Sequence, residues 1–159
     1  MSNADRVAIA CIAILAFIAA FHFYWGLGGK VGMDAAVPQR ETGEPLFKPS
    51  AVASHAVGLA LSAAALCVLA YSGFVLLPVP FQAIRAIVAL LAVIFTVRAL
   101  GWFRYAGFFK AVRDTTFGKY DTWLYCPLCL LLGLGLLYVL VKPCSLTLYE
   151  FFEFHRALC

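Results

Sequence analysis

The residues best suited to chemistry lie between Arg98 and Cys129, in the stretch RALGWFRYAGFFKAVRDTTFGKYDTWLYCPLC. It holds an arginine and an aspartate that could form an ion pair, Arg98 and Asp121, and it ends in a Cys-x-x-C pair, Cys126 and Cys129. A buried ion pair can anchor the polar head of a ligand, and a cysteine at the start of a helix can become a reactive thiol. Both kinds of chemistry depend on the elements that position these side chains.

The composition predicts that these elements cross a membrane. The chain has 159 residues, of which 64% are hydrophobic and 13% charged, with a mean hydropathy of +0.93. A soluble domain carries about 25% charged residues, and one bilayer crossing needs about 20 apolar residues. The length therefore allows about four spans and no separate soluble domain. The net charge of +4 is too small and dispersed for a nucleic-acid-binding surface.

The hydropathy pattern predicts a single all-α domain over residues 1–159, an integral membrane four-helix bundle. Glycine and proline between the first two apolar runs indicate a loop over residues 26–50, and Pro78 and Pro80 indicate a short turn between the second and third. A tail over residues 144–159 is expected to lie along the membrane surface. The four spans are predicted at residues 7–25, 51–77, 81–103 and 122–141.

The segment 104–120 has a helical rather than a loop-like pattern. Apolar residues follow the i, i+3, i+4, i+7 spacing of one helix face, and charged residues fall on the opposite face. The apolar set is Tyr105, Phe108, Phe109 and Val112, and the charged set is Lys110, Arg113 and Asp114. This pattern predicts a short amphipathic helix in the membrane interface between spans three and four.

Four antiparallel spans bring polar and aromatic residues together at one end of the bundle. The end of the first span, the start of the second, the end of the third and the start of the fourth must share one side of the membrane. The candidate ligand-binding residues at that end are His22, Tyr24, Trp25, His55, Arg98, Trp102, Arg104, Tyr105, Asp121 and Tyr125. Two histidines without a third ligand at fixed spacing do not make a metal site, so we expect none.

Arg98 is the strongest single candidate, because it lies about five residues, or about 8 Å, inside the predicted end of its span. A charge at that depth is costly and is a functional hypothesis by default, although an arginine can also extend to lipid headgroups. Asp121 could be its partner, and an aspartate before an apolar helix could equally be an N-cap.

The Cys126 and Cys129 pair raises an alternative, a membrane thiol or quinone oxidoreductase. A C-x-x-C at the start of the last of four spans is similar to that of the disulfide-forming quinone reductases related to vitamin K epoxide reductase. That resemblance implies a second cysteine pair in an exposed loop. The loop over residues 26–50 contains no cysteine.

Three motifs together resemble a family of small, uncharacterised four-span membrane proteins. They are the run from His22 to Gly29, the run from Arg98 through Gly101 to Lys110, and the run from Asp121 to Cys129. The resemblance extends over nearly the whole chain. It implies the four-span architecture and the grouping of these motifs, and it implies no particular activity or cofactor.

The sequence favours a binding or accessory protein whose polar end holds a lipid, quinone-like or other amphipathic molecule. A third possibility is a subunit of a homo-oligomer or larger membrane complex, with Ser54, Gly58 and Ser62 forming a small-residue contact face. The side of the membrane with the longer loops has seven Lys and Arg residues, and the other side has four. Because cytoplasmic loops carry an excess of Lys and Arg, this count predicts that loops 26–50 and 104–121 lie in the cytoplasm. The seven are Lys30, Arg40, Lys48, Arg104, Lys110, Arg113 and Lys119, and the four are Arg6, Arg85, Lys142 and Arg156.

Overall fold

The computed structural model describes residues 1–101 and 103–142, and this part of the chain is helical apart from loops and one isolated β-bridge, Gln39 to Pro45. Its helices are α1 (Asn3–Gly26), α2 (Met33–Ala36), α3 (Ala51–Tyr71), α4 (Phe81–Leu100), α5 (Thr116–Tyr120), the π-helical turn η1 (Asp121–Tyr125) and α6 (Cys126–Val141). Within the described residues, four helical runs are long and apolar enough to cross a membrane: α1, α3, α4 and the continuous run Thr116–Val141. The predicted all-α fold with four spans is confirmed.

Local chemistry sets most helix ends. Ser2 forms a capping box with Asp5 at the start of α1, and Ser50 Oγ accepts a hydrogen bond from the Ala53 amide at the start of α3. Helix α3 ends at Tyr71 rather than at the expected residue 77, because Gly73 adopts a φ of +76° and turns the chain. Helix α4 likewise ends at Leu100 instead of continuing to residue 103.

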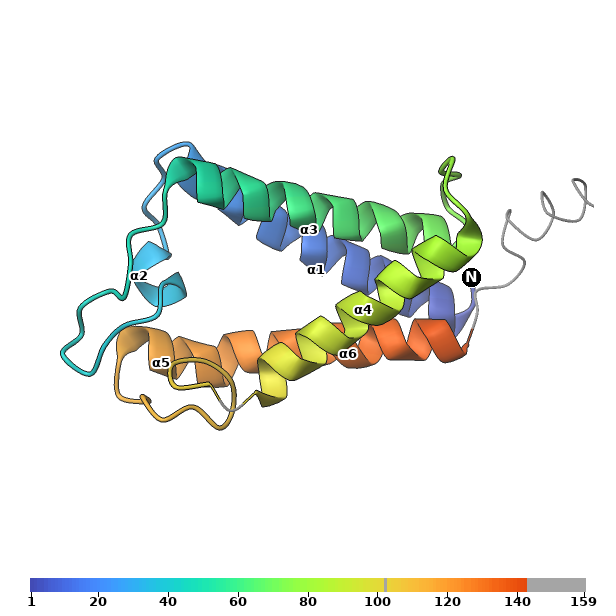
Figure 1. Ribbon diagram of the computed structural model, residues 1–159. Helices are drawn as coiled ribbons and strands as arrows, with labels where there is room; N and C mark the ends of the chain where they lie inside the picture. The colour runs from blue at the N-terminus through green and yellow to red at the C-terminus, as the bar shows by residue number, and fades with distance from the viewer. Residues whose placement is uncertain (102, 143–159) are drawn as a thin grey trace, which may run out of the picture.

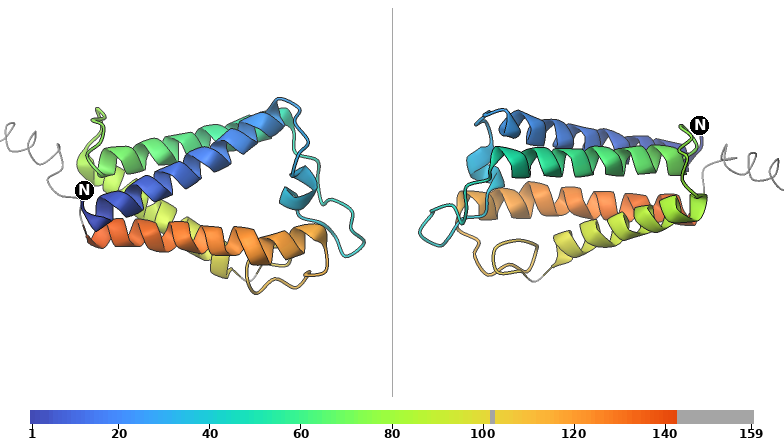
Figure 2. Two further views of the ribbon diagram at one scale, coloured as in Figure 1. Left: turned by 180° about the vertical axis from the view of Figure 1, so that it is seen from behind. Right: turned by 45° about the horizontal axis from the view of Figure 1, so that its top comes forward.

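The long helices form two pairs, α1 with α3 and α4 with the α5–α6 run (Figure 1). The pairs meet near the N-terminus and diverge toward the end that carries α2 and α5, which gives the molecule the wedge shape of Figure 2. The core shared by all four helices lies in the closed half of the wedge, where Leu15, Val68, Val88 and Leu136 are fully buried. The structure of the open half therefore depends more on loops and polar contacts.

Part of the small-residue face of α3 packs inside the molecule. Ser54 and Gly58 are buried, and a Cβ added at Gly58 would lie 3.0 Å from the ring of Phe23 on α1. The close approach of α1 and α3 thus depends on this glycine. Ser62, the third residue of this face, is exposed.

The segment 104–120 differs from the single amphipathic helix predicted for it. Residues 103–115 form an irregular loop, and regular helix begins only at Thr116, so the last span begins six residues earlier than residue 122. Gly107 has a φ of +96°, which a helix does not allow, and Lys110 turns inward instead of facing solvent. The predicted tail over residues 144–159 and the candidate residue Trp102 lie outside the described residues.

Candidate functional site

Asp121 lies at the centre of the polar residues at the open end. Thr115 Oγ1 caps the run Thr116–Val141 by accepting a hydrogen bond from the Gly118 amide, 3.0 Å away, so Asp121 enters the run after one helical turn. It is the first residue of the π-helical turn η1, and its side chain is fully buried. Single π-helical turns are frequent at functional sites, since the extra residue changes the direction of the neighbouring side chains. The alternative that Asp121 is the N-cap is wrong.

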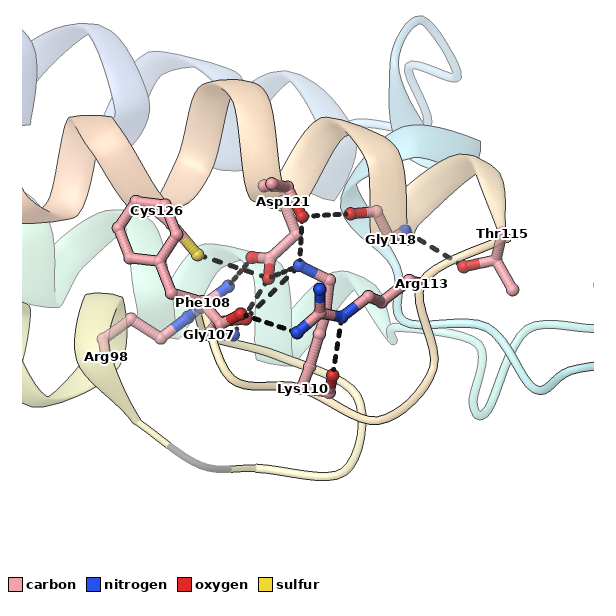
Figure 3. Close-up of polar contacts among 10 residues, drawn as sticks. Arg98, Gly107, Phe108, Lys110, Arg113, Thr115, Gly118, Asp121 and Cys126 are labelled. Carbon is pink, nitrogen blue, oxygen red and sulfur yellow. Dashed lines mark hydrogen bonds and ion pairs between the residues drawn. The ribbon is translucent and has the colours of Figure 1, made fainter.

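Both carboxylate oxygens of Asp121 are occupied by donors from three separate elements (Figure 3). Oδ1 accepts from Arg98 Nη2 of α4 at 2.6 Å. Oδ2 accepts from the Gly107 amide at 2.9 Å and from Cys126 Sγ at 3.4 Å, and it lies 3.1 Å from Lys110 Nζ. The predicted Arg98–Asp121 pairing is present, and it is part of a larger network.

Lys110 is a second cation on the same carboxylate. Its side chain is fully buried, and besides Asp121 its Nζ donates to Thr122 Oγ1 at 2.6 Å and to the Gly107 carbonyl at 3.3 Å. Three acceptors match the three N–H donors of an ammonium group. The Thr122 hydroxyl in turn donates to the Gly118 carbonyl at 3.1 Å, so the network has a consistent direction of hydrogen bonding.

The fold of the loop over residues 103–115 positions the Gly107 amide and Lys110 Nζ beside Asp121. Gly107 packs so closely on Gly101 that an added Cβ would collide with the Gly101 carbonyl oxygen. The Phe108 amide donates to the Ala99 carbonyl at 2.8 Å, and Arg113 Nη2 donates to the Phe108 carbonyl at 3.5 Å. The loop is thereby tied to the end of α4, with its Gly107 amide directed at Asp121.

Arg98 is the member of the network that reaches the outside. Its side chain is 32% exposed, whereas those of Lys110 and Asp121 are 0% exposed. One guanidinium nitrogen, Nη2, is used by Asp121, and the other, Nη1, is buried and has no hydrogen-bond partner among the described residues. Arg98 therefore retains donor capacity that Asp121 does not use.

The predicted site residues of α1 and α3 form a separate group. His22 and His55 each place Nδ1 near the carbonyl four residues earlier in the same helix, at 2.9 and 2.7 Å. Trp25 Nε1 donates to the Val31 carbonyl at 2.9 Å, and the Tyr24 hydroxyl accepts from the Val31 amide at 3.5 Å. Trp25 and Tyr24 thus hold the turn after α1, and none of the four side chains makes one of the contacts to Asp121 described above.

The remaining predicted residues that the structure describes are Arg104, Tyr105 and Tyr125. Arg104 is exposed, with its guanidinium 5.6 Å from the ring centre of Tyr105 and 4.0 Å from Glu41. The ring of Tyr125 packs at 6.1 Å from that of Phe117. Of the predicted ligand-binding residues that the structure describes, the network around Asp121 thus contains Arg98 and Asp121.

Lys110 and Gly107, which contact the Asp121 carboxylate directly, were not predicted. Lys110 fits the polar face of an amphipathic pattern, and that pattern assigns it to solvent. Gly107 itself is the sequence feature that could have indicated the contacts of both residues, because a glycine within an aromatic segment favours a backbone that departs from a helix. No pattern in the sequence indicates that Asp121 has a second cation.

The geometry of the cysteine pair does not favour thiol exchange. Cys126 is fully buried, and its Sγ–H points at the Asp121 carboxylate, a contact that requires the protonated thiol. Cys129 is half-buried, and both cysteines are free thiols. In the part of the chain that the structure describes, no three His, Cys, Asp or Glu side chains are arranged to hold a metal ion.

A family model described as "Protein of unknown function (DUF3995)" matches residues 15–136. The chain belongs to this family. The match runs from the middle of α1 into α6 and so includes the whole network around Asp121. No curated protein and no solved structure matches the chain. Membership in the DUF3995 family agrees with the predicted resemblance to small four-span membrane proteins.

We expect Asp121→Asn to destabilise the protein strongly. The change leaves Arg98 and the buried Lys110 without a counter-charge, a loss of about 3–5 kcal/mol for a broken buried ion pair. The measurement is the free energy of unfolding in mixed micelles by SDS titration. Asp114→Asn, at an exposed aspartate of the same loop, is the matched control and should leave stability unchanged. Equal stability of the two variants would contradict a structural role for the carboxylate.

Proposed function

We propose that this DUF3995 protein binds a lipid or other amphipathic molecule at its polar end, with the head of the ligand on Arg98. The proposal rests on the Arg98 side chain, which is 32% exposed and whose guanidinium group has a buried Nη1 without a hydrogen-bond partner among the described residues. A guanidinium presents its donors as a planar fork suited to carboxylate or phosphate oxygens. Asp121 has no free acceptor position facing outward, so its part is to orient Arg98 rather than to touch the ligand.

An apolar stripe along α4 supports an amphipathic ligand over a small polar one. Ile87, Leu91 and Ile94 precede Arg98 at the 3–4-residue spacing of one helix face. Ile87 is 40% and Ile94 49% exposed, and Leu91 is partly buried. An acyl or isoprenoid chain lying on this stripe would bring its polar head to the guanidinium of Arg98.

The alternatives have less support. A thiol oxidoreductase needs a cysteine that a partner can reach, and Cys126 is enclosed and hydrogen-bonded to Asp121. An accessory subunit needs a contact face, and in the small-residue face expected for it Ser54 and Gly58 are buried while Ser62 is exposed. Neither alternative has a positive observation comparable to the unused donor of Arg98.

We place the polar end in the cytoplasm, with loops 26–50 and 104–121 on that side. Lys110 is committed to Asp121, and without it six Lys and Arg residues remain on the loop side against four on the other. A reporter fused before Met1 that is active only outside the cytoplasm should be active. An inactive reporter beside an active cytoplasmic one at the same position would reverse the orientation.

The ligand proposal is tested by native mass spectrometry of the wild-type protein and of Arg98→Ala, gently extracted from the membrane. We expect a defined small-molecule adduct on the wild type that is absent from Arg98→Ala, because the head of the ligand loses its donor. Arg104→Ala is the control, since Arg104 is a more exposed arginine at the same end. Bare protein in all three samples, or an adduct that persists in Arg98→Ala, would contradict the proposal.

A further inference from the structure

The charges around Asp121 do not balance. Two cations, Arg98 and Lys110, share one carboxylate, and the described residues provide neither with a second ion-pair partner. Lys110 and Asp121 are fully buried, and Arg98 is partly buried. A buried excess charge is costly unless a counter-ion or additional hydrogen bonds compensate it.

From this imbalance we infer that the ligand of Arg98 is a singly charged phosphodiester, the head of an anionic phospholipid. The inference rests on the proposed ligand site and adds the charge of its occupant. One negative charge at Arg98 would bring the group of Arg98, Lys110, Asp121 and ligand to neutrality. A phosphodiester has one negative charge and two free oxygens, which suit the fork of a guanidinium.

The position of the excess charge agrees with a lipid source. Lys110 has three acceptors for its three protons and is closed off from the surface, so no unused donor remains on it. Arg98 has a side chain that is 32% exposed, at the end of the apolar stripe on α4, and its Nη1 donor is buried without a hydrogen-bond partner among the described residues. A lipid with its chain on that stripe and its phosphate at the exposed part of the Arg98 guanidinium group meets both conditions.

Lys110 would then determine which ligand binds without touching it. In Lys110→Met the pair of Arg98 and Asp121 is neutral by itself, and the demand for an added anion disappears. In Arg98→Gln the pair of Lys110 and Asp121 is neutral in the same way, and the donor fork is lost as well. A purely steric or structural role of Lys110 would not change the preference among lipids that differ only in charge.

The experiment measures binding of defined lipids to the purified full-length protein in a neutral detergent by native mass spectrometry. The probes are phosphatidylglycerol, which is singly negative, phosphatidylcholine, which is zwitterionic, and diacylglycerol, which is uncharged, all with the same acyl chains. We expect the wild type to prefer phosphatidylglycerol over diacylglycerol by at least about tenfold, the effect of one charge-assisted contact. Lys110→Met and Arg98→Gln should each lose this preference, and the control Arg104→Gln should keep it.

Different results overturn different claims. Wild-type binding of diacylglycerol as tight as that of phosphatidylglycerol, lost in Arg98→Gln, would leave the ligand site standing and overturn the charge inference. An unchanged preference in folded Lys110→Met would also overturn it. If Lys110→Met does not fold, Arg98→Lys takes its place, because it keeps the excess charge and should keep the preference that Arg98→Gln loses. Failure of the wild type to bind any of the lipids overturns both claims.

Competition with inorganic phosphate distinguishes a lipid headgroup from a free phosphate ion as the ligand of Arg98. Phosphate at millimolar concentration should not displace phosphatidylglycerol from the wild type, because the acyl chain contributes apolar contact along α4. Displacement by phosphate, together with equal binding of short- and long-chain lipids, would assign the site to a free anion and overturn the lipid source.

Discussion

The polar end of this protein depends on one buried carboxylate that holds two cations from different elements. Arg98 comes from the end of α4 and Lys110 from the loop that follows it, and both meet the side chain of Asp121 at the start of the last span. Burying charged side chains in an apolar environment destabilises the fold by several kcal/mol per ion unless each ion is paired and hydrogen-bonded. The oxygens of Asp121 meet this condition with Arg98, Lys110, the Gly107 amide and the Cys126 thiol.

The shape of the bundle explains why this network is needed. The four long helices share a core in the closed half of the wedge, and toward α2 and α5 the two pairs diverge (Figure 2). At the open end, the Gln39 side chain connects the loop after α1 to α5 by accepting a hydrogen bond from the Phe117 amide at 3.2 Å. The network around Asp121 performs the corresponding task within the α4–α6 pair. The polar site is held by loops and ion pairs at the open end, away from the core that the four helices share in the closed half.

The sequence predicts the fold well because each span is a long apolar run, and a bilayer leaves few alternatives to helices. The proximity of Arg98 and Asp121 was also predictable, since the end of one span and the start of the next must lie on the same side. The local form of the connecting segment was not. Its apolar residues recur at helical spacing, which predicts a helix. The segment is an irregular loop instead, because Gly107 has a positive φ and Lys110 forms an ion pair with the buried carboxylate of Asp121.

A double-mutant cycle between Lys110 and Asp121 tests most directly whether their ion pair organises the polar end. It compares the free energies of unfolding, by SDS titration, of the wild type, Lys110→Met, Asp121→Asn and the double variant. The two side chains are in contact and buried, so their effects should be strongly non-additive, with an interaction energy of about 1–3 kcal/mol. Additive effects within about 0.3 kcal/mol would mean that Lys110 and Asp121 act independently, and the network could not be what organises the polar end.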